Sequence, residues 1–241
     1  MKIYSRTDIG KKRSINQDAY YVGEFDDGSA FAIVCDGMGG HMAGDIASER
    51  AISVISDYIK KSYSPKMNSS AVENLLRAAV DSANTEIYDL AYSSSDFEGM
   101  GTTVVIAFVI GNLAHIIHVG DSRAYLLRAE EIEQLTTDHS IVQAMLLRGE
   151  ISEDEAKTHP RKNVIYRALG IADSVMCDYN IALKPENVSI LLCSDGLSNL
   201  VEEHTLLETF KTASREDFVS KVVDLANEAG GSDNITAVLI S

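Results

Sequence analysis

The sequence has few of the residues that mark several classes of protein. Its 241 residues contain three cysteines, three prolines and no tryptophan. The cysteines are odd in number and none form a Cys-x-x-Cys pair, which argues against a disulfide framework and against a zinc knuckle. Cys35 and Cys193 lie inside apolar runs, so we expect both to be thiols in the core.

Linkers and long apolar runs are also missing. Without a Ser/Gly/Pro-rich linker, a low-complexity tract or a repeat, we expect a single domain over residues 1–241. No apolar run reaches the roughly 18 residues of a membrane span, and the first residues lack the pattern of a secretory signal. We therefore expect a cytoplasmic protein without membrane insertion, and a monomer.

Basic residues are scarce relative to acidic ones. Lysine and arginine number 21 against 36 aspartates and glutamates, a formal net charge of −15. Such a surface repels nucleic acid and anionic membranes. It would also repel a phosphate group unless bound cations reverse the field locally.

The apolar pattern predicts a layered α+β domain. Strands are expected at 30–35, 102–110, 113–119, 124–127, 188–193 and 235–240. The turn sequences at 111–112 and 120–122 suggest an antiparallel meander over 102–135. Amphipathic helices are expected at about 43–61, 70–91, 202–211 and 215–229. Helix pairs on either side of antiparallel strands predict a four-layer α-β-β-α sandwich of two mainly antiparallel sheets.

An aspartate stands at the end of four predicted strands, with glycine next to it or within three residues. Asp36, Asp121 and Asp195 follow apolar runs, and Asp233 precedes the last one. Each alone is better explained as an ordinary turn residue. Together they predict one shared site at the mouth of the sheets.

Clustered carboxylates without a cation would repel one another. Oxygen ligands with no nearby histidine or cysteine pair favour hard ions, Mg²⁺ or Mn²⁺, over Zn²⁺. Two such ions a few ångströms apart could activate a water and hold it in line with a phosphorus atom. The ions would then draw a phosphate to an acidic protein.

Seven short motifs carry a family resemblance that spans nearly the whole chain. They are RSINQD at 13–18, VCDGMGGH at 34–41, GMGTT at 99–103, VGDSRAY at 119–125, LTTDH at 135–139, LCSDG at 192–196 and GSDNIT at 231–236. In this order the motifs resemble the metal-dependent protein serine/threonine phosphatases of type 2C, in their compact bacterial form. The resemblance implies hydrolysis of phosphoserine and phosphothreonine on proteins by a metal-bridging hydroxide.

The resemblance also implies a binuclear Mn²⁺ or Mg²⁺ centre, two ions per chain with room for a third. Asp36 would bridge both ions, and the carbonyl of Gly37 would serve the second. Asp195 and Asp233 would serve the first, and Asp121 would help Asp195 hold a third.

Two further residues are assigned by the same resemblance. Asp18 would act through metal-bound water, and Arg13 would grip the substrate phosphate with its planar fork of donors. A solvated surface arginine is the alternative for Arg13.

The sequence departs from many relatives in two places. Met38 stands where they carry a histidine proposed to protonate the leaving oxygen, and a thioether supplies no proton. His41 is the nearest substitute and a candidate catalytic residue, or it simply opens the following helix. Gln17 replaces a glutamate, which would weaken one water-mediated contact to a metal.

Residues 139–168 correspond in the resemblance to a flap subdomain beside the cleft. Its basic residues would contact acidic phosphopeptides or form a solvated face; they are Lys157, His159, Arg161, Lys162 and Arg167. The implied partners are phosphoproteins, including a bacterial Ser/Thr protein kinase whose signalling the enzyme would reverse. A catalytically dead phosphoprotein-binding domain, a structural cation-binding protein and a nucleotide-binding loop fit less well, because the aspartates are all present and neither an EF-hand nor a P-loop pattern occurs.

Overall fold

A computed structural model describes residues 1–39 and 43–241, and they form two antiparallel sheets. The first sheet has the order β1 (Ile3–Asp8), β11 (Ile235–Ile240), β10 (Ser189–Cys193), β7 (Arg123–Leu127) and β8 (Ile132–Gln134). The second has the order β2 (Asp18–Glu24), β3 (Ala30–Met38), β5 (Val104–Ile110), β6 (Leu113–Val119) and β9 (Asp178–Leu183), and the short β4 (Gly101–Thr102) pairs with the end of β3.

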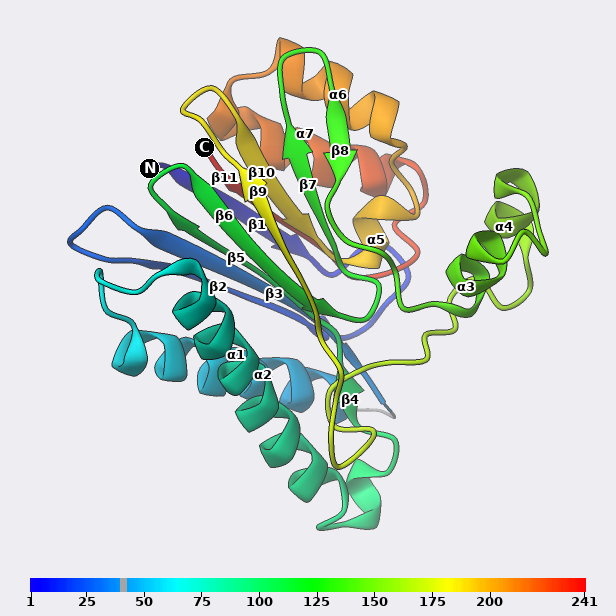
Figure 1. Ribbon diagram of the computed structural model, residues 1–241. Coiled ribbons are helices and arrows are strands. Elements are labelled where there is room, and N and C mark those ends of the chain that lie inside the picture. The colour runs from blue at the N-terminus through cyan, green and yellow to red at the C-terminus, as the bar shows by residue number, and fades with distance from the viewer. Residues whose placement is uncertain (40–42) are drawn as a thin grey trace.

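Helices cover the outer face of each sheet (Figure 1). The second sheet carries α1 (Ala43–Ser62) and α2 (Ser69–Ala91), and the first carries α6 (Glu203–Thr212) and α7 (Arg215–Glu228). The short α5 (Asp195–Ser198) follows β10, and the 3-10 turn η1 (Ser95–Phe97) follows α2. The predicted four-layer sandwich is confirmed. No helix among the described residues combines the length and apolar character needed to cross a membrane.

The alternation of side chains explains why the strands read as unbroken apolar runs. On β3, Phe31 and Ile33 pack against the α1 and α2 layer, whereas Ala32 and Val34 pack between the two sheets. Successive residues of a strand point to opposite faces, so a strand buried on both faces needs apolar residues at every position. Cys35 and Cys193 lie in these layers as buried thiols, as expected.

The predicted meander over 102–135 is wrong in its second half. β5 and β6 pair as expected, but β6 then pairs with β9, and β7 pairs with β10 and β8 in the other sheet. The chain changes sheets at the turn after Val119, where Gly120 has a φ of +106°. Because the chain crosses from one sheet to the other here, β6 and β7 belong to different sheets. The crossing also places Asp121 at the end of the sandwich.

Strands β1, β2, β8 and β9 were not predicted. They carry many half-exposed or exposed polar residues, since they lie at the sheet edges. Their mixed pattern gives no apolar run for a strand prediction to rest on.

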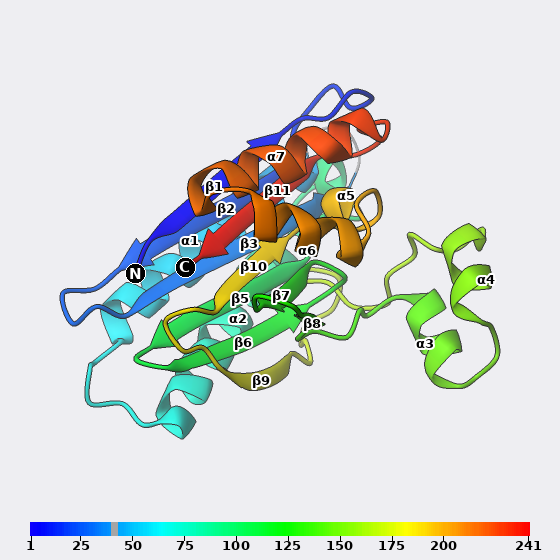
Figure 2. The same cartoon turned by 90° about the horizontal axis from the view of Figure 1, so that it is seen from above.

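The segment 139–168 contains α3 (Ile141–Leu147) and α4 (Glu153–Thr158) and stands away from the sandwich in both views (Figures 1 and 2). Its two ends are held together, because the Tyr166 N–H donates to the His139 carbonyl at 2.8 Å and the Ile141 N–H donates to the Val164 carbonyl at 2.9 Å. Ser152 and Glu155 form a capping box at the start of α4.

Candidate metal centre

Six of the predicted site residues line one open pocket of about 240 Å³ at one end of the sandwich. They are Arg13, Asp36, Gly37, Asp121, Asp195 and Asp233. Each comes from a different loop or strand end except the adjacent pair on β3, so the fold gathers residues spread over 220 positions. The shared site predicted from strand ends is therefore present as a spatial cluster.

Backbone hydrogen bonds on both sides of Asp36 fix its position. Its N–H donates to Thr103 Oγ1 at 3.0 Å, and its carbonyl accepts from the Thr103 N–H at 2.9 Å and from Thr102 Oγ1 at 3.0 Å. The Thr103 hydroxyl also contacts Ser122 Oγ at 2.7 Å, next to Asp121. Thr103 thus links the supports of two pocket carboxylates. Sequence reasoning missed this role, although Thr103 lies in one of the quoted motifs.

Glycine is required after Asp36 and after Asp195 by close packing of the chain. A Cβ at Gly37 would lie 1.9 Å from the Gly44 carbonyl oxygen, and one at Gly196 would lie 1.9 Å from the Asn234 carbonyl oxygen. Any side chain at either position would push apart the segments that carry the carboxylates. The Asp-Gly pairs therefore allow β3 to approach α1, and α5 to approach the loop before β11.

Asp18 lies beneath the pocket rather than in its lining. It stands opposite Asp36 in the β2–β3 register and is 8% exposed. Its Oδ2 accepts from Ser194 Oγ and from Thr236 Oγ1, each at 2.7 Å. Its Oδ1 is buried without a hydrogen-bond partner among the described residues, as is Oδ1 of Asp195.

Burial raises the pKa values of these carboxyls. The pKa of Asp18 is raised to about 7 by burial and by the charges of Asp195 and Asp233, against two hydrogen bonds that lower it. The pKa of Asp121 is raised to about 8 by burial and by Asp195. Burial raises the pKa of Asp36 well above its usual range, with Asp18 as the next cause. Burial and Asp233 also raise the pKa of Asp195.

The donor set fits hard divalent cations. Its members are carboxylate oxygens in one pocket, two of the buried oxygens have no hydrogen-bond partner in the described chain, and the acids repel one another when charged. A cation among them would satisfy the free oxygens and remove the repulsion. The residues present therefore suit Mg²⁺ or Mn²⁺.

Arg13 faces the same pocket from the loop between β1 and β2. Its guanidinium donates to Asp233 Oδ2 at 2.7 Å, and its side chain is 48% exposed. Asn234 holds this loop in place: its Nδ2 donates to the carbonyls of Ile9 and Ile15, and its Oδ1 accepts from the Gln17 N–H. Sequence reasoning did not assign Asn234 a role, although it follows Asp233 directly.

Both residues that depart from the family pattern lie in the lining of the metal-centre pocket. Met38 lines the pocket, and its Cε lies 2.7 Å from where a Cβ of Gly101 would be. Gln17 also lines the pocket. His41 lies outside the described residues, so its catalytic role stays a prediction.

A second cluster that could in principle bind a metal lies at the base of the segment 139–168. It consists of His118, His139 and Asp178, whose ligand atoms lie within 4.8 Å of one another. His139 Nδ1 accepts from the Gly120 N–H at 3.1 Å, so the ring proton is on Nε2, facing Asp178 Oδ2 at 3.3 Å. Arg167 donates to the other oxygen of Asp178 at 3.0 Å. The Arg167–Asp178 ion pair and the His139–Asp178 hydrogen bond thus tie both ends of the segment to β9.

Comparison with known proteins gives a consistent result. The model of the family described as Protein phosphatase 2C matches residues 10–239. The serine/threonine phosphatase stp of Listeria monocytogenes is 42% identical over 236 residues, which cover 98% of this chain and 93% of that protein.

Solved structures agree with the sequence relatives. A serine/threonine phosphatase of S. agalactiae superposes with a TM-score of 0.92 at 35% identity, covering 99% of this chain and 98% of that one. The catalytic domain of the serine/threonine protein phosphatase PstP in complex with two manganese ions superposes with a TM-score of 0.84 at 33% identity, covering 99% and 96% of the two chains.

Proposed function

Because this chain belongs to the protein phosphatase 2C family of metal-dependent serine/threonine phosphatases, we propose that it hydrolyses phosphoserine and phosphothreonine in proteins at a binuclear Mn²⁺ or Mg²⁺ centre. One observation carries the proposal: five carboxylates from distant parts of the chain meet in or beneath one pocket, together with an arginine. The chemistry that two such ions would supply when bound is activation of a water for direct attack on phosphorus.

We assign each of these residues a position around the ions. We assign the bridging position to Asp36, which is the carboxylate fixed by three backbone hydrogen bonds. Asp195 and Asp233 serve one ion and the Gly37 carbonyl serves the other. Asp121 helps Asp195 hold a third ion. Asp18, buried beneath Asp36, acts through an ordered water, and its free Oδ1 supports this assignment.

Arg13 binds the phosphate of the substrate in this proposal. Its partly exposed guanidinium has one donor on Asp233 and leaves others free for phosphoryl oxygens. The positive charge of the guanidinium thereby offsets negative charge on the phosphoryl group. His41 stays a candidate for the proton donor to the leaving oxygen.

The biological setting follows from the same proposal. The substrates are phosphoproteins, among them a Ser/Thr protein kinase whose signalling the enzyme reverses in the bacterial cytoplasm. The enzyme acts as a monomeric single domain, with residues 139–168 as a flap beside the pocket. The similarity to the Listeria and S. agalactiae phosphatases supports this setting.

Phosphate release from a phosphothreonine peptide tests the proposed function. With Mn²⁺ present we expect multiple turnovers, and excess EDTA should lower the rate at least 100-fold, because the ions that would activate the attacking water are removed. Dialysis followed by Mn²⁺ should restore activity. Turnover that persists in EDTA would reject the two-metal proposal.

Replacing Arg13 by alanine is expected to lower kcat/KM for the phosphopeptide by about 10- to 100-fold, the scale of a lost charge-assisted phosphate contact. Most of the loss should appear in KM, and Arg13→Lys should recover part of it. Because the substitution also frees Asp233, Mn²⁺ must be kept saturating. Arg50→Ala is a matched control, since Arg50 is exposed and pairs with Glu86 on α2. Equal losses in both variants would contradict the phosphate role.

A further inference from the structure

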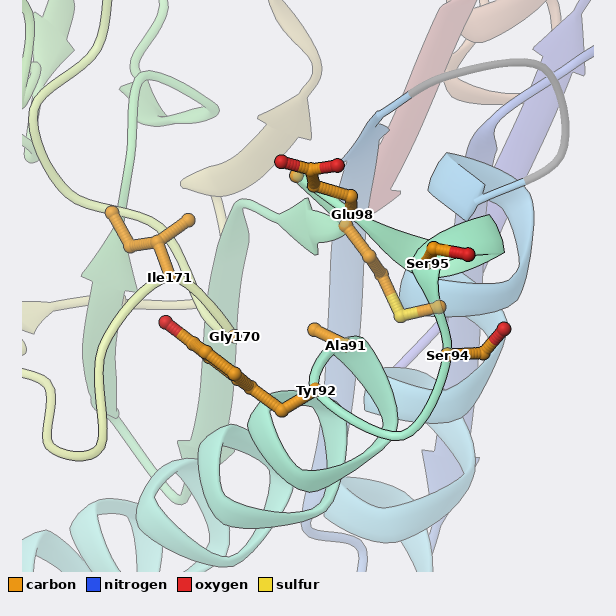
Figure 3. A pocket seen from close by; sticks show the side chains of 9 residues that line it. Ala91, Tyr92, Ser94, Ser95, Glu98, Gly170 and Ile171 are labelled. Carbon is orange, nitrogen blue, oxygen red and sulfur yellow. The ribbon is translucent and has the colours of Figure 1, made fainter.

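A second pocket, of about 440 Å³, lies at the C-terminal end of α2. Its lining comes from the end of α2, the stretch before β4 and the segment after Leu169, and includes Ala91, Tyr92, Glu98, Met100, Gly170 and Ile171 (Figure 3). None of its described lining residues belongs to the metal-centre pocket. Nothing in the proposed reaction uses it.

The linings of the two pockets meet where the end of β3 pairs with β4. Met38 and Gly39 line the metal-centre pocket, and β4 pairs Met38 with Gly101. A Cβ at Gly39 would lie 3.3 Å from Met100 Cα and 3.4 Å from the Gly99 carbonyl oxygen. From strand spacing and rise, the second pocket is about 10–15 Å from Asp36, a span of roughly three or four residues of extended peptide.

The walls of this pocket are apolar and its rim is acidic. Tyr92 is 73% exposed and Ile171 is 45% exposed, and the buried Met100 also lines the pocket. The carboxylate of Glu98 stands above these side chains in Figure 3 and has no ion-pair partner within the described part of the chain. Asp96 and Asp173, both exposed, lie on the same two wall segments.

This chemistry matches a long aliphatic side chain that ends in a cation. The stem of a lysine or arginine packs well on apolar and aromatic side chains while its head stays in water beside a carboxylate. The described lining contains no lysine, arginine or histidine that would compete for Glu98. The net charge of −15 further favours a basic segment over an acidic one.

We propose that this pocket binds a lysine or arginine side chain of the phosphoprotein substrate, about three or four residues away from the phosphorylated residue. The proposal rests on the proposed function, because only a substrate anchored at the metal centre places that side chain over the pocket. It makes the pocket a determinant of which phosphorylated sites are hydrolysed fastest.

A lysine scan tests the pocket. In a polyalanine-based phosphothreonine peptide, one lysine is moved through the five positions on each side, and a second series carries norleucine, which keeps the stem but lacks the charge. On one side, lysine three or four positions away should raise kcat/KM about fivefold over alanine, the scale of a partly exposed ion pair with its packing. Norleucine at the same position should give about half of the lysine gain in kcat/KM.

Two variants separate the charge from the stem. Glu98→Gln should lower kcat/KM for the lysine peptide to the value for the norleucine peptide. Tyr92→Ala should lower kcat/KM for both peptides to the value for the alanine peptide. Both side chains are exposed, so the fold should persist. Hydrolysis of p-nitrophenyl phosphate, which does not reach the pocket, should be unchanged. Glu186→Gln is the matched control, since Glu186 lies in the exposed turn between β9 and β10.

The outcomes distinguish this inference from the proposed function. A flat lysine scan with good turnover, or a lysine preference that Glu98→Gln leaves intact, would overturn the pocket assignment alone. Release of phosphate from none of the peptides would overturn the proposed function and the pocket assignment together.

Discussion

Asp36→Asn is expected to lower phosphatase activity at least 1,000-fold at saturating Mn²⁺, since removal of the carboxylate that we propose as the bridge would affect both ions at once. Asparagine has the same shape but no charge, and it binds Mg²⁺ or Mn²⁺ more weakly. The loss should appear in kcat with p-nitrophenyl phosphate as well as with a phosphopeptide. Calorimetric titration should show at least one Mn²⁺ equivalent missing.

The same variant should fold well. The hydrogen bonds that hold Asp36 come from its own backbone to Thr102 and Thr103, and the substitution keeps them. Burial and neighbouring carboxylates raise the pKa of Asp36, so a neutral side chain relieves repulsion in the metal-free protein. In EDTA, Asp36→Asn should therefore melt at the same temperature as the parent protein or higher.

Asp224→Asn is the control for this experiment. Asp224 lies on α7, is largely exposed and pairs with Arg6. It should keep full activity and full Mn²⁺ binding. If Asp36→Asn retained more than a tenth of the parent activity, or if its loss came with unfolding in EDTA, the bridging role would be wrong.

The location of the site was predictable because its carboxylates follow long apolar strands. The apolar run of a buried strand stops at the first polar residue, so Asp36 and Asp195 could be placed near a sheet end from the pattern alone. The burial of Asp18 beneath the pocket could not be predicted in this way. It begins a half-exposed edge strand, and only the register with β3 places it beneath Asp36.

The parts that pattern reasoning missed depend on long-range contacts. The hydroxyl of Thr103 accepts from a residue of β3 67 positions away, and the amide of Asn234 donates to a loop up to 225 positions away, which no local spacing reveals. The change of sheet at Gly120 was missed for a similar reason. A Gly-Asp-Ser turn is equally suited to a hairpin and to a crossing, and only the pairing of β6 with β9 decides between them.

Removing divalent ions is expected to destabilise the protein strongly at pH 8 and only slightly at pH 5. In the metal-free protein the folded state holds protons on Asp18 up to about pH 7 and on Asp121 up to about pH 8, against an ordinary value of 3.8. A raised folded pKa means that the stability of the metal-free protein is lost as pH rises through this window. Bound ions replace the protons, so the holoprotein avoids that loss.

The histidines act in the opposite direction and must be separated. Burial lowers the pKa values of His115, His118 and His139, so their contribution to stability is lost as pH falls. They are not among the described lining residues of the metal-centre pocket, so their effect is common to the holoprotein and the metal-free protein. The difference in Tm with and without Mn²⁺ at each pH therefore reports the carboxylates.

At pH 8, two ions each at 100 times their Kd would contribute about 5 kcal/mol together, or about 10–20 °C in Tm for a domain of this size. At pH 5 the difference should fall to a few degrees, because protons compete for the same oxygens. Titration of Mn²⁺ at pH 7 in two buffers of different ionisation enthalpy should show net proton release. A Tm difference that stayed constant from pH 5 to 8, without proton release, would mean that the raised carboxyls are not the ligands.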